Sequence, residues 1–337
     1  MPPYLKPNDI YAADAPGNLS PVVKNYPSRI YVPSTETNTV TVIDPKTYKI
    51  IAVYRTGRQP QHVTPSYDLK TLWILNDQGN SLTAIDPATA KLGKTIKVED
   101  PYNMYYTPDG KFAIVVAERR LRLDFLDAAT MTLKNSLPVP CRGVDHIDFS
   151  ADGTYLIASC EFAGAVIKVD VAKQSLIGRL PLNGGGMPQD VKLSPDGTVF
   201  YVADMDANGV HLLDGDHFKE IGFVPTGKGA HGLYVSRDSK WLYVSNRGEG
   251  SISVIDFATR KVAQKWDLPG KASPDMGGVS ADGNVLWLSG RYSREVYAID
   301  AHNGKLLARI PVGRGPHGLC VYPQPGRYSL GHTGIFR

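Results

Sequence analysis

The stretch from Ala230 to Leu268, AHGLYVSRDSKWLYVSNRGEGSISVIDFATRKVAQKWDL, decides the fold. It contains four runs rich in β-branched and aromatic residues, HGLYVS, WLYVSN, ISVID and KVAQKWDL, which we name strands A, B, C and D. Short polar turns such as RDSK and FATR separate the runs. Runs of this composition joined by short turns form antiparallel hairpins, so the stretch predicts one four-stranded antiparallel sheet.

The same unit recurs along the chain, and its third strand ends in aspartate each time. These aspartates are Asp44, Asp86, Asp127, Asp170, Asp214, Asp256 and Asp300. Their spacing stays between 41 and 44 residues. No segment shows sustained helical periodicity. Four antiparallel strands per repeat of 40 to 50 residues are typical of a β-propeller, so we expect an all-β chain.

The two ends of the chain determine the number of blades. The chain enters the repeat at a B-like strand, RIYVPS from Arg29, and its last clear strand is the A-like HGLCVYP from His317. We therefore predict a single seven-bladed propeller over residues 29–323, whose last blade combines a C-terminal inner strand with the N-terminal B, C and D strands. Such closure leaves the ring without an open seam. Residues 1–28 are expected to pack on the propeller as an extension and residues 324–337 as a tail, both as surface loops.

The motifs RIYVPSTETNTVTVID, WLYVSNRGEGSISVID and GTVFYVADMDANGVHLLD resemble the YVTN family of β-propeller repeats over nearly the whole chain. The resemblance implies the fold specifically, whereas propellers carry unrelated activities. Relatives in this broad group include surface-layer-type proteins, haem-binding domains of the cytochrome nitrite reductase kind, and lactonase- and lyase-type enzymes. Many are exported. The resemblance therefore implies a secreted or periplasmic protein whose signal peptide is absent from this chain, with the cytoplasm as the alternative.

Composition narrows the classes of partner. The net charge is only +4, with 21% charged and 42% hydrophobic residues, so we expect no nucleic-acid partner. The longest apolar runs have five to seven residues, too short to span a membrane. We expect a monomer that binds a small polar or anionic ligand, with another protein as an alternative partner.

The junctions between strand D and strand A carry an excess of histidine. In register they read Gln61-His62, Tyr102-Asn103, Asp145-His146, Gln189-Asp190, His231-Gly232, Asp275-Met276 and His317-Gly318. Four of the eight histidines occupy these fourteen positions, where random placement would put about 0.3. Because strand A lines the channel of a propeller, these side chains should converge at one mouth. Alternatively, duplication copied a junction that tolerates polar residues, and water fills the channel.

The residues at this mouth suggest several kinds of chemistry. His231 and His317 flank Asp275 around the ring, and this His-Asp-His arc predicts a site for a divalent transition metal. Non-covalent haem is the other candidate cofactor, because no CxxCH motif is present. If the protein is an enzyme, the candidate catalytic residues are His231, His317, Glu118 and Glu161. Further residues are expected to bind a cofactor or ligand: Arg247, Arg291, His62, His146, Asp145 and Gln189.

The loops between strands B and C add charge to the same rim. Acidic residues come first, at Asp77, Glu118, Glu161, Asp204 and Asp206, and two neighbouring blades then carry Arg247 and Arg291. The two guanidinium groups could clamp a carboxylate or phosphate. Alternatively, they pair with Glu249 and Glu295 in their own loops.

The cysteines favour an oxidising compartment. Cys141 comes just before a strand A and Cys160 ends the following strand B, so antiparallel pairing should bring them into disulfide range. The alternative is two reduced thiols in a cytosolic protein. Cys320 lies within the closing strand and is expected to be buried.

Three functions follow from these patterns. The first is a ligand- or cofactor-binding propeller that uses the His- and Asp-rich channel mouth. The second is a metal-assisted lactonase- or lyase-like enzyme on the same face, and the third is a protein-interaction scaffold. The sequence leaves open whether a reaction is catalysed.

Overall fold

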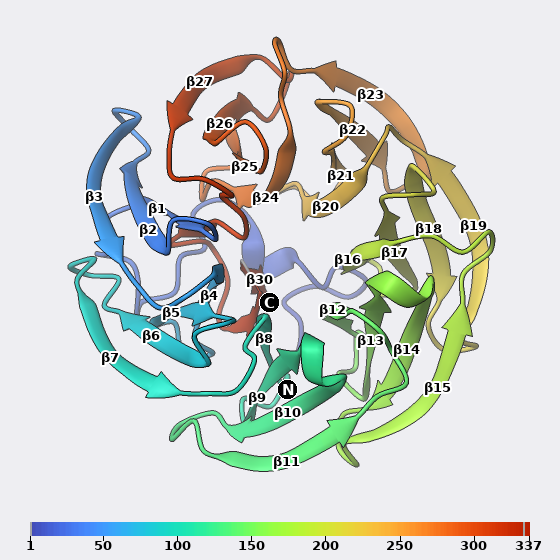
Figure 1. The fold of residues 1–337 in the computed structure, drawn as a ribbon. Coiled ribbons are helices and arrows are strands. Elements are labelled where there is room, and N and C mark those ends of the chain that lie inside the picture. The colour runs from blue at the N-terminus through green and yellow to red at the C-terminus, as the bar shows by residue number, and fades with distance from the viewer. Residues whose placement is uncertain (1, 333) are drawn as a thin grey trace.

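The computed structural model describes residues 2–332 and 334–337 and confirms the seven-bladed propeller. Figure 1 shows the seven sheets arranged as a ring around a central axis. Within the described residues the only helices are three single turns, η1 (Ala12–Asp14), η2 (Glu118–Arg120) and η3 (Glu161–Ala163). We number the blades by their third strands in chain order.

Each blade contains four antiparallel strands from the channel outwards. The innermost strands are β28 (Cys320–Tyr322), β4 (Pro60–Pro65), β8 (Asn103–Tyr106), β12 (Val144–Phe149), β16 (Pro188–Leu193), β20 (Ala230–Val235) and β24 (Pro274–Val279). The second strands are β1 (Arg29–Ser34), β5 (Leu72–Asn76), β9 (Phe112–Ala117), β13 (Tyr155–Cys160), β17 (Val199–Asp204), β21 (Trp241–Asn246) and β25 (Val285–Gly290).

The third strands are β2 (Thr39–Asp44), β6 (Ser81–Ile85), β10 (Arg122–Asp127), β14 (Ala165–Asp170), β18 (Gly209–Asp214), β22 (Ser251–Asp256) and β26 (Glu295–Asp300). The outer strands are β3 (Lys49–Arg55), β7 (Leu92–Lys97), β11 (Leu133–Pro138), β15 (Ser175–Pro181), β19 (Lys219–Pro225), β23 (Lys261–Asp267) and β27 (Leu306–Pro311).

The ring closes as the sequence predicts. In the first blade the strand order is β28-β1-β2-β3, so the C-terminal strand is the inner partner of the N-terminal one. The antiparallel register pairs Ile30 with Val321 and Tyr31 with Cys320. All four of these residues are buried, at 1% exposure or less. The two ends of the chain therefore share one sheet and one core.

The repeated aspartate has a local structural cause. In the first blade, Oδ1 of Asp44 accepts a hydrogen bond from the backbone N–H of Lys46, and its Oδ2 accepts one from the hydroxyl of Thr47. These bonds close the turn into the outer strand and lower the pKa of Asp44. The aspartate is thus a turn former rather than part of a site.

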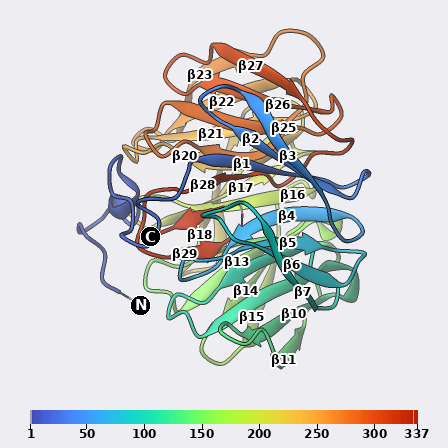
Figure 2. The ribbon, with the colours of Figure 1, turned by 90° about the vertical axis from the view of Figure 1, so that its left-hand side faces the viewer.

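The N-terminal residues cover the face opposite the junctions between outer and inner strands. The N–H of Ile10 donates to the carbonyl of Pro195, and the hydroxyl of Tyr11 donates to the carbonyl of Leu193. Figure 2 shows this segment in blue on one side of the ring, with the C-terminus beside it. The segment closes that end of the channel, while the other mouth faces the viewer in Figure 1.

The C-terminal residues do not form the surface loops that the sequence analysis expected. Strands β29 (Ser329–Gly331) and β30 (Ile335–Phe336) extend the third blade inwards, in the order β11-β10-β9-β8-β29-β30. The terminal Arg337 is buried and forms an ion pair with Asp148 at 3.0 Å. The expectation was wrong because apolar residues such as Leu330 and Phe336 bury themselves against the blades, despite the glycines between them.

Candidate functional site

The junction residues are turned into the channel by a repeated β-bulge. In five blades the register between the inner strand and the second strand shifts at the second and third residues of the inner strand. In the fourth blade, for example, Asp145 and His146 together face only Ser159. A bulge inserts one extra residue and redirects its side chain, and bulges often lie beside functional sites.

A serine of the second strand stabilises three of these bulges. Its hydroxyl oxygen accepts the backbone N–H of His146, Gly232 or Met276, from Ser159, Ser245 and Ser289 respectively. The donor–acceptor distances lie between 2.8 and 3.2 Å. The recurring serine of strand B therefore has a positioning role: it satisfies the amide that the bulge removes from the ladder.

Five histidine rings meet in the channel. They are His62, His146, His231, His317 and His332, and each is at most 3% exposed. Neighbouring ring centroids lie between 4.8 and 6.4 Å apart. The sequence analysis identified the first four through their junction positions, and the structure brings all four together.

The predicted arc of His231, Asp275 and His317 is one compact group. One donor atom from each residue lies within 4.8 Å of the other two. Nδ1 of His231 is 3.3 Å from Oδ1 of Asp275, and Nε2 of His317 is 3.7 Å from Oδ2 of the same carboxylate. These residues come from the sixth blade, the seventh blade and the segment that precedes β28. The donor set is two imidazoles and a carboxylate, which suits transition metals such as zinc or iron.

A second compact group consists of His62, His146 and His332. The sequence analysis missed His332, because it placed the C-terminal tail outside the repeat. Its backbone N–H donates to the carbonyl of Met104 in β8, the strand that pairs with β29. The alternation of large and small residues in YSLGHTGIF is the signal that could have indicated a strand there.

Burial keeps the imidazoles neutral. Desolvation lowers the pKa of His62 to about 4, against the opposing effect of its hydrogen bond to the Tyr102 carbonyl. It also lowers the pKa of the other four channel histidines well below the usual value. A neutral imidazole is the form that binds a metal ion.

Burial has the opposite effect on the carboxyl groups of the channel. Desolvation, reinforced by Glu161 and Glu118, raises the pKa of Asp145 well above its usual range. Desolvation also raises the pKa of Asp275, although the positive charge of Arg247 counteracts it. A cation bound beside these carboxyl groups would lower their pKa and favour their ionised form.

Several buried polar atoms of the channel lack a hydrogen-bond partner among the described residues. They are Nε2 of His62, His146 and His332, Nδ1 of His317, Oδ2 of Asp275, and both carboxylate oxygens of Asp145. Two of these atoms, Nε2 of His146 and Oδ1 of Asp145, lie 3.2 Å from each other as an ion pair. Buried polar groups in folded proteins are normally satisfied by protein, ordered water or a bound ion. These atoms therefore offer several donors and acceptors at one place, where ordered water or an ion could satisfy them.

The two predicted arginines lie beside this group but do not pair as the alternative expected. Arg247 contacts Asp275 of the next blade at 3.1 Å, and its side chain is only 12% exposed. Glu249 pairs instead with Lys265, and Glu295 with Arg309. Nη1 of Arg291 is buried without a hydrogen-bond partner among the described residues. The pairing of each arginine within its own loop is therefore wrong, and Arg291 retains a free donor.

The acidic residues of the rim divide into two groups. Asp77 forms an ion pair with Arg119 at 3.1 Å, and Asp204 accepts backbone N–H groups of its own loop, so both have local structural partners. Glu118 and Glu161 come from η2 and η3 at the channel mouth. Desolvation and the neighbouring Glu161 raise the pKa of Glu118 to about 7. Desolvation also raises the pKa of Glu161, against a hydrogen bond with Gln189.

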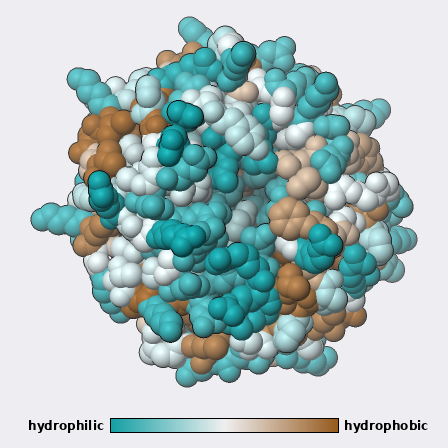
Figure 3. Space-filling view, viewed as in Figure 1, coloured by the Kyte–Doolittle hydropathy of each residue, from teal (hydrophilic) through white to brown (hydrophobic). Residues whose placement is uncertain are grey.

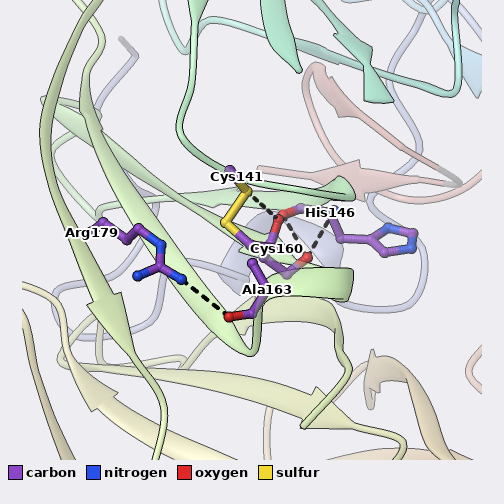
Figure 4. Close-up of a disulfide and its surroundings, with 6 residues drawn as sticks. Cys141, His146, Cys160, Ala163 and Arg179 are labelled. Carbon is purple, nitrogen blue, oxygen red and sulfur yellow. Dashed lines mark hydrogen bonds between the residues drawn. A yellow bond between two sulfur atoms is a disulfide. The ribbon is translucent and has the colours of Figure 1, made fainter. Parts of the chain in front are cut away.

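A disulfide holds the junction that carries Asp145 and His146. Cys141 and Cys160 are bonded, with their Cα atoms 5.1 Å apart, as the sequence analysis expected. Figure 4 shows the bond at the start of the inner strand, with the ring of His146 pointing away from it. Cys320 is a buried free thiol, also as expected.

The face that carries this mouth is polar at its centre. Figure 3, drawn from the same side as Figure 1, shows mostly hydrophilic residues around the middle of the disc, with hydrophobic ones towards its edge. In the part of the chain that the structure describes, no helix is both long and apolar enough to cross a membrane. The mouth therefore presents charged and hydrogen-bonding groups to an incoming molecule.

Fold and channel together define a seven-bladed β-propeller with a buried cluster of histidines and carboxylates at its axis. The model of the YNCE-like beta-propeller family matches residues 13–326. The chain belongs to that family, which agrees with the resemblance noted from its repeats.

Two relatives of known sequence are similar to much of the chain. The "Hydrazine synthase subunit beta" of Kuenenia stuttgartiensis is 24% identical over 66% of this chain, and the match spans only 60% of that subunit. The "Uncharacterized protein YncE" of Salmonella typhi is 22% identical over 73% of each chain.

Two solved structures share the fold. The Pseudomonas aeruginosa periplasmic gluconolactonase PpgL superposes with a TM-score of 0.73 and 20% identity, covering 88% of this chain and 99% of that one. The dihydro-heme d1 dehydrogenase NirN, solved in complex with DHE, superposes with a TM-score of 0.67 and 17% identity, covering 90% of this chain and 76% of that one. At these identities the likeness establishes the fold alone.

Proposed function

We propose that this protein is a binding propeller that holds a divalent transition-metal ion in its channel through His231, Asp275 and His317. The observation that carries the proposal is the grouping of these three buried donors within 4.8 Å of one another. Oδ2 of Asp275, which lies 3.7 Å from Nε2 of His317, also lacks a hydrogen-bond partner among the described residues. A cation there would satisfy atoms that burial otherwise leaves at a cost in free energy.

The packing of the rings favours an ion over a haem. The channel histidines lie 4.8 to 6.4 Å apart, centroid to centroid, and carboxylates and an asparagine lie among them. Donors at these separations surround a space of ionic size, whereas a haem needs a flat, mainly apolar cleft. Binding of DHE is a property of the neighbour NirN, and the residues around this channel do not reproduce an apolar cleft.

The rim supplies a second part of the proposed site. Arg291 has a buried donor without a partner among the described residues, and Arg247 lies 3.1 Å from the proposed ligand Asp275. A small anion, such as a carboxylate or phosphate, would bind the metal ion and these guanidinium groups together. We expect the protein to act as a monomer towards such a ligand.

The proposal includes a location outside the cytoplasm. A disulfide links Cys141 and Cys160, and structural disulfides persist in oxidising compartments. The fold is shared with a periplasmic gluconolactonase, which supports the same location. Alkylation of the protein taken directly from its native compartment would leave Cys141 and Cys160 unmodified if the proposal holds.

Calorimetric titration of the metal-free protein with Zn²⁺ tests the metal site. We expect the double variant His231→Ala/His317→Ala to bind one ion fewer per chain than the wild type. The matched control is His217→Ala, which removes a histidine whose side chain is 74% exposed and lies outside the channel. The same stoichiometry in the double variant and the control would place the ion elsewhere and overturn the proposal.

One observation favours a hydrolytic enzyme as a second candidate. The pKa of Glu118 is raised to about 7, which suits a general base at neutral pH, and Glu118 lies in η2 at the channel mouth. A bound ion would polarise a lactone carbonyl while the carboxylate activates water. Loss of lactone hydrolysis in Glu118→Gln, with Zn²⁺ binding intact, would favour this enzyme, and absence of hydrolysis in the wild type would exclude it for the lactone used.

A further inference from the structure

We infer that the channel has a second metal site, formed by His62, His146 and His332, and that the C-terminal segment completes it. This site is independent of the one at His231, Asp275 and His317, so it goes beyond the function proposed above. The two sites share no residue. Their closest rings, His62 and His317, lie 4.8 Å apart between centroids.

The first line of argument is the donor set. One ring nitrogen from each of the three histidines lies within 4.8 Å of the other two, and all three side chains are buried. Three neutral imidazoles with an open fourth position are a common arrangement for a zinc ion.

The second line of argument is the orientation of the rings. The Nδ1–H of His62 donates to the Tyr102 carbonyl at 2.9 Å, which leaves the lone pair on Nε2. Nε2 of His62 has no hydrogen-bond partner among the described residues. Nε2 of His146 lies 3.2 Å from Oδ1 of Asp145, and Nε2 of His332 lies 3.7 Å from Oδ1 of Asp190. A ligating histidine in metal sites usually donates its other ring N–H to a carboxylate, a backbone carbonyl or water. His62 shows this pattern, whereas Nδ1 of His146 and Nδ1 of His332 face the amide nitrogen of Asn103.

Asn103 is the positioning residue for the other two rings. Its Nδ2 lies 3.1 Å from Nδ1 of His146 and 3.0 Å from Nδ1 of His332. Ligation through Nε2 puts a proton on each Nδ1, so Asn103 must then turn its amide oxygen towards them. Asn103→Asp presents oxygen acceptors without that rotation, whereas Asn103→Leu presents none.

The C-terminal segment contributes His332 by docking against the third blade. Gly331 pairs with Tyr105, and the N–H of His332 donates to the Met104 carbonyl at 2.7 Å. On the far side of His332, Arg337 forms a buried ion pair with Asp148 and lies over the ring of Tyr11 at 4.4 Å. Metal bound at this site would therefore tie the segment to two strands, β4 and β12, which carry the other ligands.

Zn²⁺ titration of the metal-free protein distinguishes the two sites by stoichiometry. We expect two ions per chain for the wild type and the His217→Ala control, and one ion for His332→Ala, for His62→Ala and for His231→Ala/His317→Ala. We expect Asn103→Leu to weaken the second site about 10- to 100-fold, as outer-sphere changes do, and Asn103→Asp to retain it.

Each outcome separates the two proposals. If His332→Ala and His62→Ala bind as many ions as the wild type, the second site is wrong while the first stands. If only His231→Ala/His317→Ala keeps the wild-type stoichiometry, the first site is wrong and the second stands.

Hydrogen exchange gives a readout that does not depend on stoichiometry or on the folding of a tail variant. Saturating Zn²⁺ should slow exchange of the amides of residues 329–332 in the wild type. His62→Ala keeps the tail sequence intact, and Zn²⁺ should have no such effect in it. Equal slowing in both proteins would overturn the inference that His62 and the tail hold one ion.

Discussion

Arg247 of the sixth blade contacts Asp275 of the seventh at 3.1 Å, through Nη1 and Oδ1. This buried ion pair crosses the boundary between two blades at the channel mouth. It occupies one oxygen of Asp275 and leaves Oδ2 unbonded among the described residues, 3.7 Å from Nε2 of His317. The carboxylate of Asp275 therefore holds the guanidinium of Arg247 through Oδ1, while its Oδ2 faces His317.

This relationship predicts opposite effects of one substitution on two ligands. Asp275→Asn removes the negative charge but keeps the shape of the side chain. We expect the affinity for Zn²⁺ to fall at least tenfold, because a neutral amide oxygen is a weaker ligand for a cation. Without metal, we expect phosphate to bind about tenfold more tightly, because Arg247 is no longer neutralised by its carboxylate partner.

Calorimetry with Zn²⁺, and with phosphate in the presence of a chelator, checks both effects. The control is Asp238→Asn, which changes an exposed aspartate on the opposite face of the ring. If the affinities for Zn²⁺ and for phosphate both rise or both fall in Asp275→Asn, the prediction is wrong. Asp275 would then not be shared between the cation site and Arg247.

The rim carboxylates predict a pH dependence of anion binding. The pKa of Glu118 is raised to about 7, first by desolvation and then by Glu161 and other acidic neighbours. Below that pH Glu118 is neutral, and above it the side chain repels an anion. We therefore expect phosphate affinity to fall about three- to tenfold between pH 6 and pH 8, and Glu118→Gln to remove most of that change.

Phosphate titrations at several pH values measure this effect. Phosphate itself ionises in this range, and the same titrations of Glu118→Gln show how much of the change in affinity comes from phosphate alone. Glu36→Gln is the matched control, because Glu36 also lies in a loop of this face but is 62% exposed. A pH dependence that persists unchanged in Glu118→Gln would assign it to another group.

The disulfide makes stability and the second metal site sensitive to reductant. Cys141 and Cys160 close a loop with a sequence separation of 19 residues. Loop-closure entropy of that size corresponds to about 3 kcal/mol of unfolding free energy. We expect reduction to remove that amount and to weaken Zn²⁺ binding at His146, because the bond anchors the start of the strand that carries this histidine.

Denaturant unfolding with and without reductant measures the loss. Cys320→Ala should still respond to reductant, because Cys320 is a free thiol, whereas Cys141→Ala/Cys160→Ala should not. The same response in all three proteins would show that the reductant acts elsewhere.

The repeat allowed most of the architecture to be predicted from sequence. Each blade repeats the same local signals, so the position of His231 in one junction predicts the position of His317 in another. Ring geometry then brings Asp275 between them, and the structure places the three within 4.8 Å. Antiparallel pairing similarly places Cys141 next to Cys160.

Features that occur once could not be predicted in this way. His332 reaches the channel because the tail pairs with β8, a contact between distant parts of the chain that no other blade repeats. The partner of Arg247 was also missed, since sequence neighbours such as Glu249 compete with Asp275 of the next blade. Such choices depend on side-chain packing across blades, which a local pattern does not contain.

The closing strand predicts how the whole ring unfolds. Tyr322 ends β28, is 1% exposed and donates its hydroxyl to the carbonyl of Leu69 in the second blade. It thus joins the C-terminus, the composite first blade and the next blade in one contact. Tyr322→Ala leaves a cavity and an unsatisfied carbonyl, so we expect the free energy of unfolding to fall by about 3–5 kcal/mol.

Two buried tryptophans report whether the loss of stability in Tyr322→Ala affects the blades on both sides of the closure. Trp287 lies in the seventh blade on one side of the closure and Trp73 in the second blade on the other. Because β28 makes the ring continuous, both fluorescence signals should shift to the same lower denaturant midpoint in Tyr322→Ala. Tyr292→Ala, at a side chain that is 69% exposed, should change the midpoint little, within about 0.5 kcal/mol. A shift at Trp287 alone, with Trp73 unchanged, would mean that the blades unfold separately and that the closing strand stabilises only its own sheet.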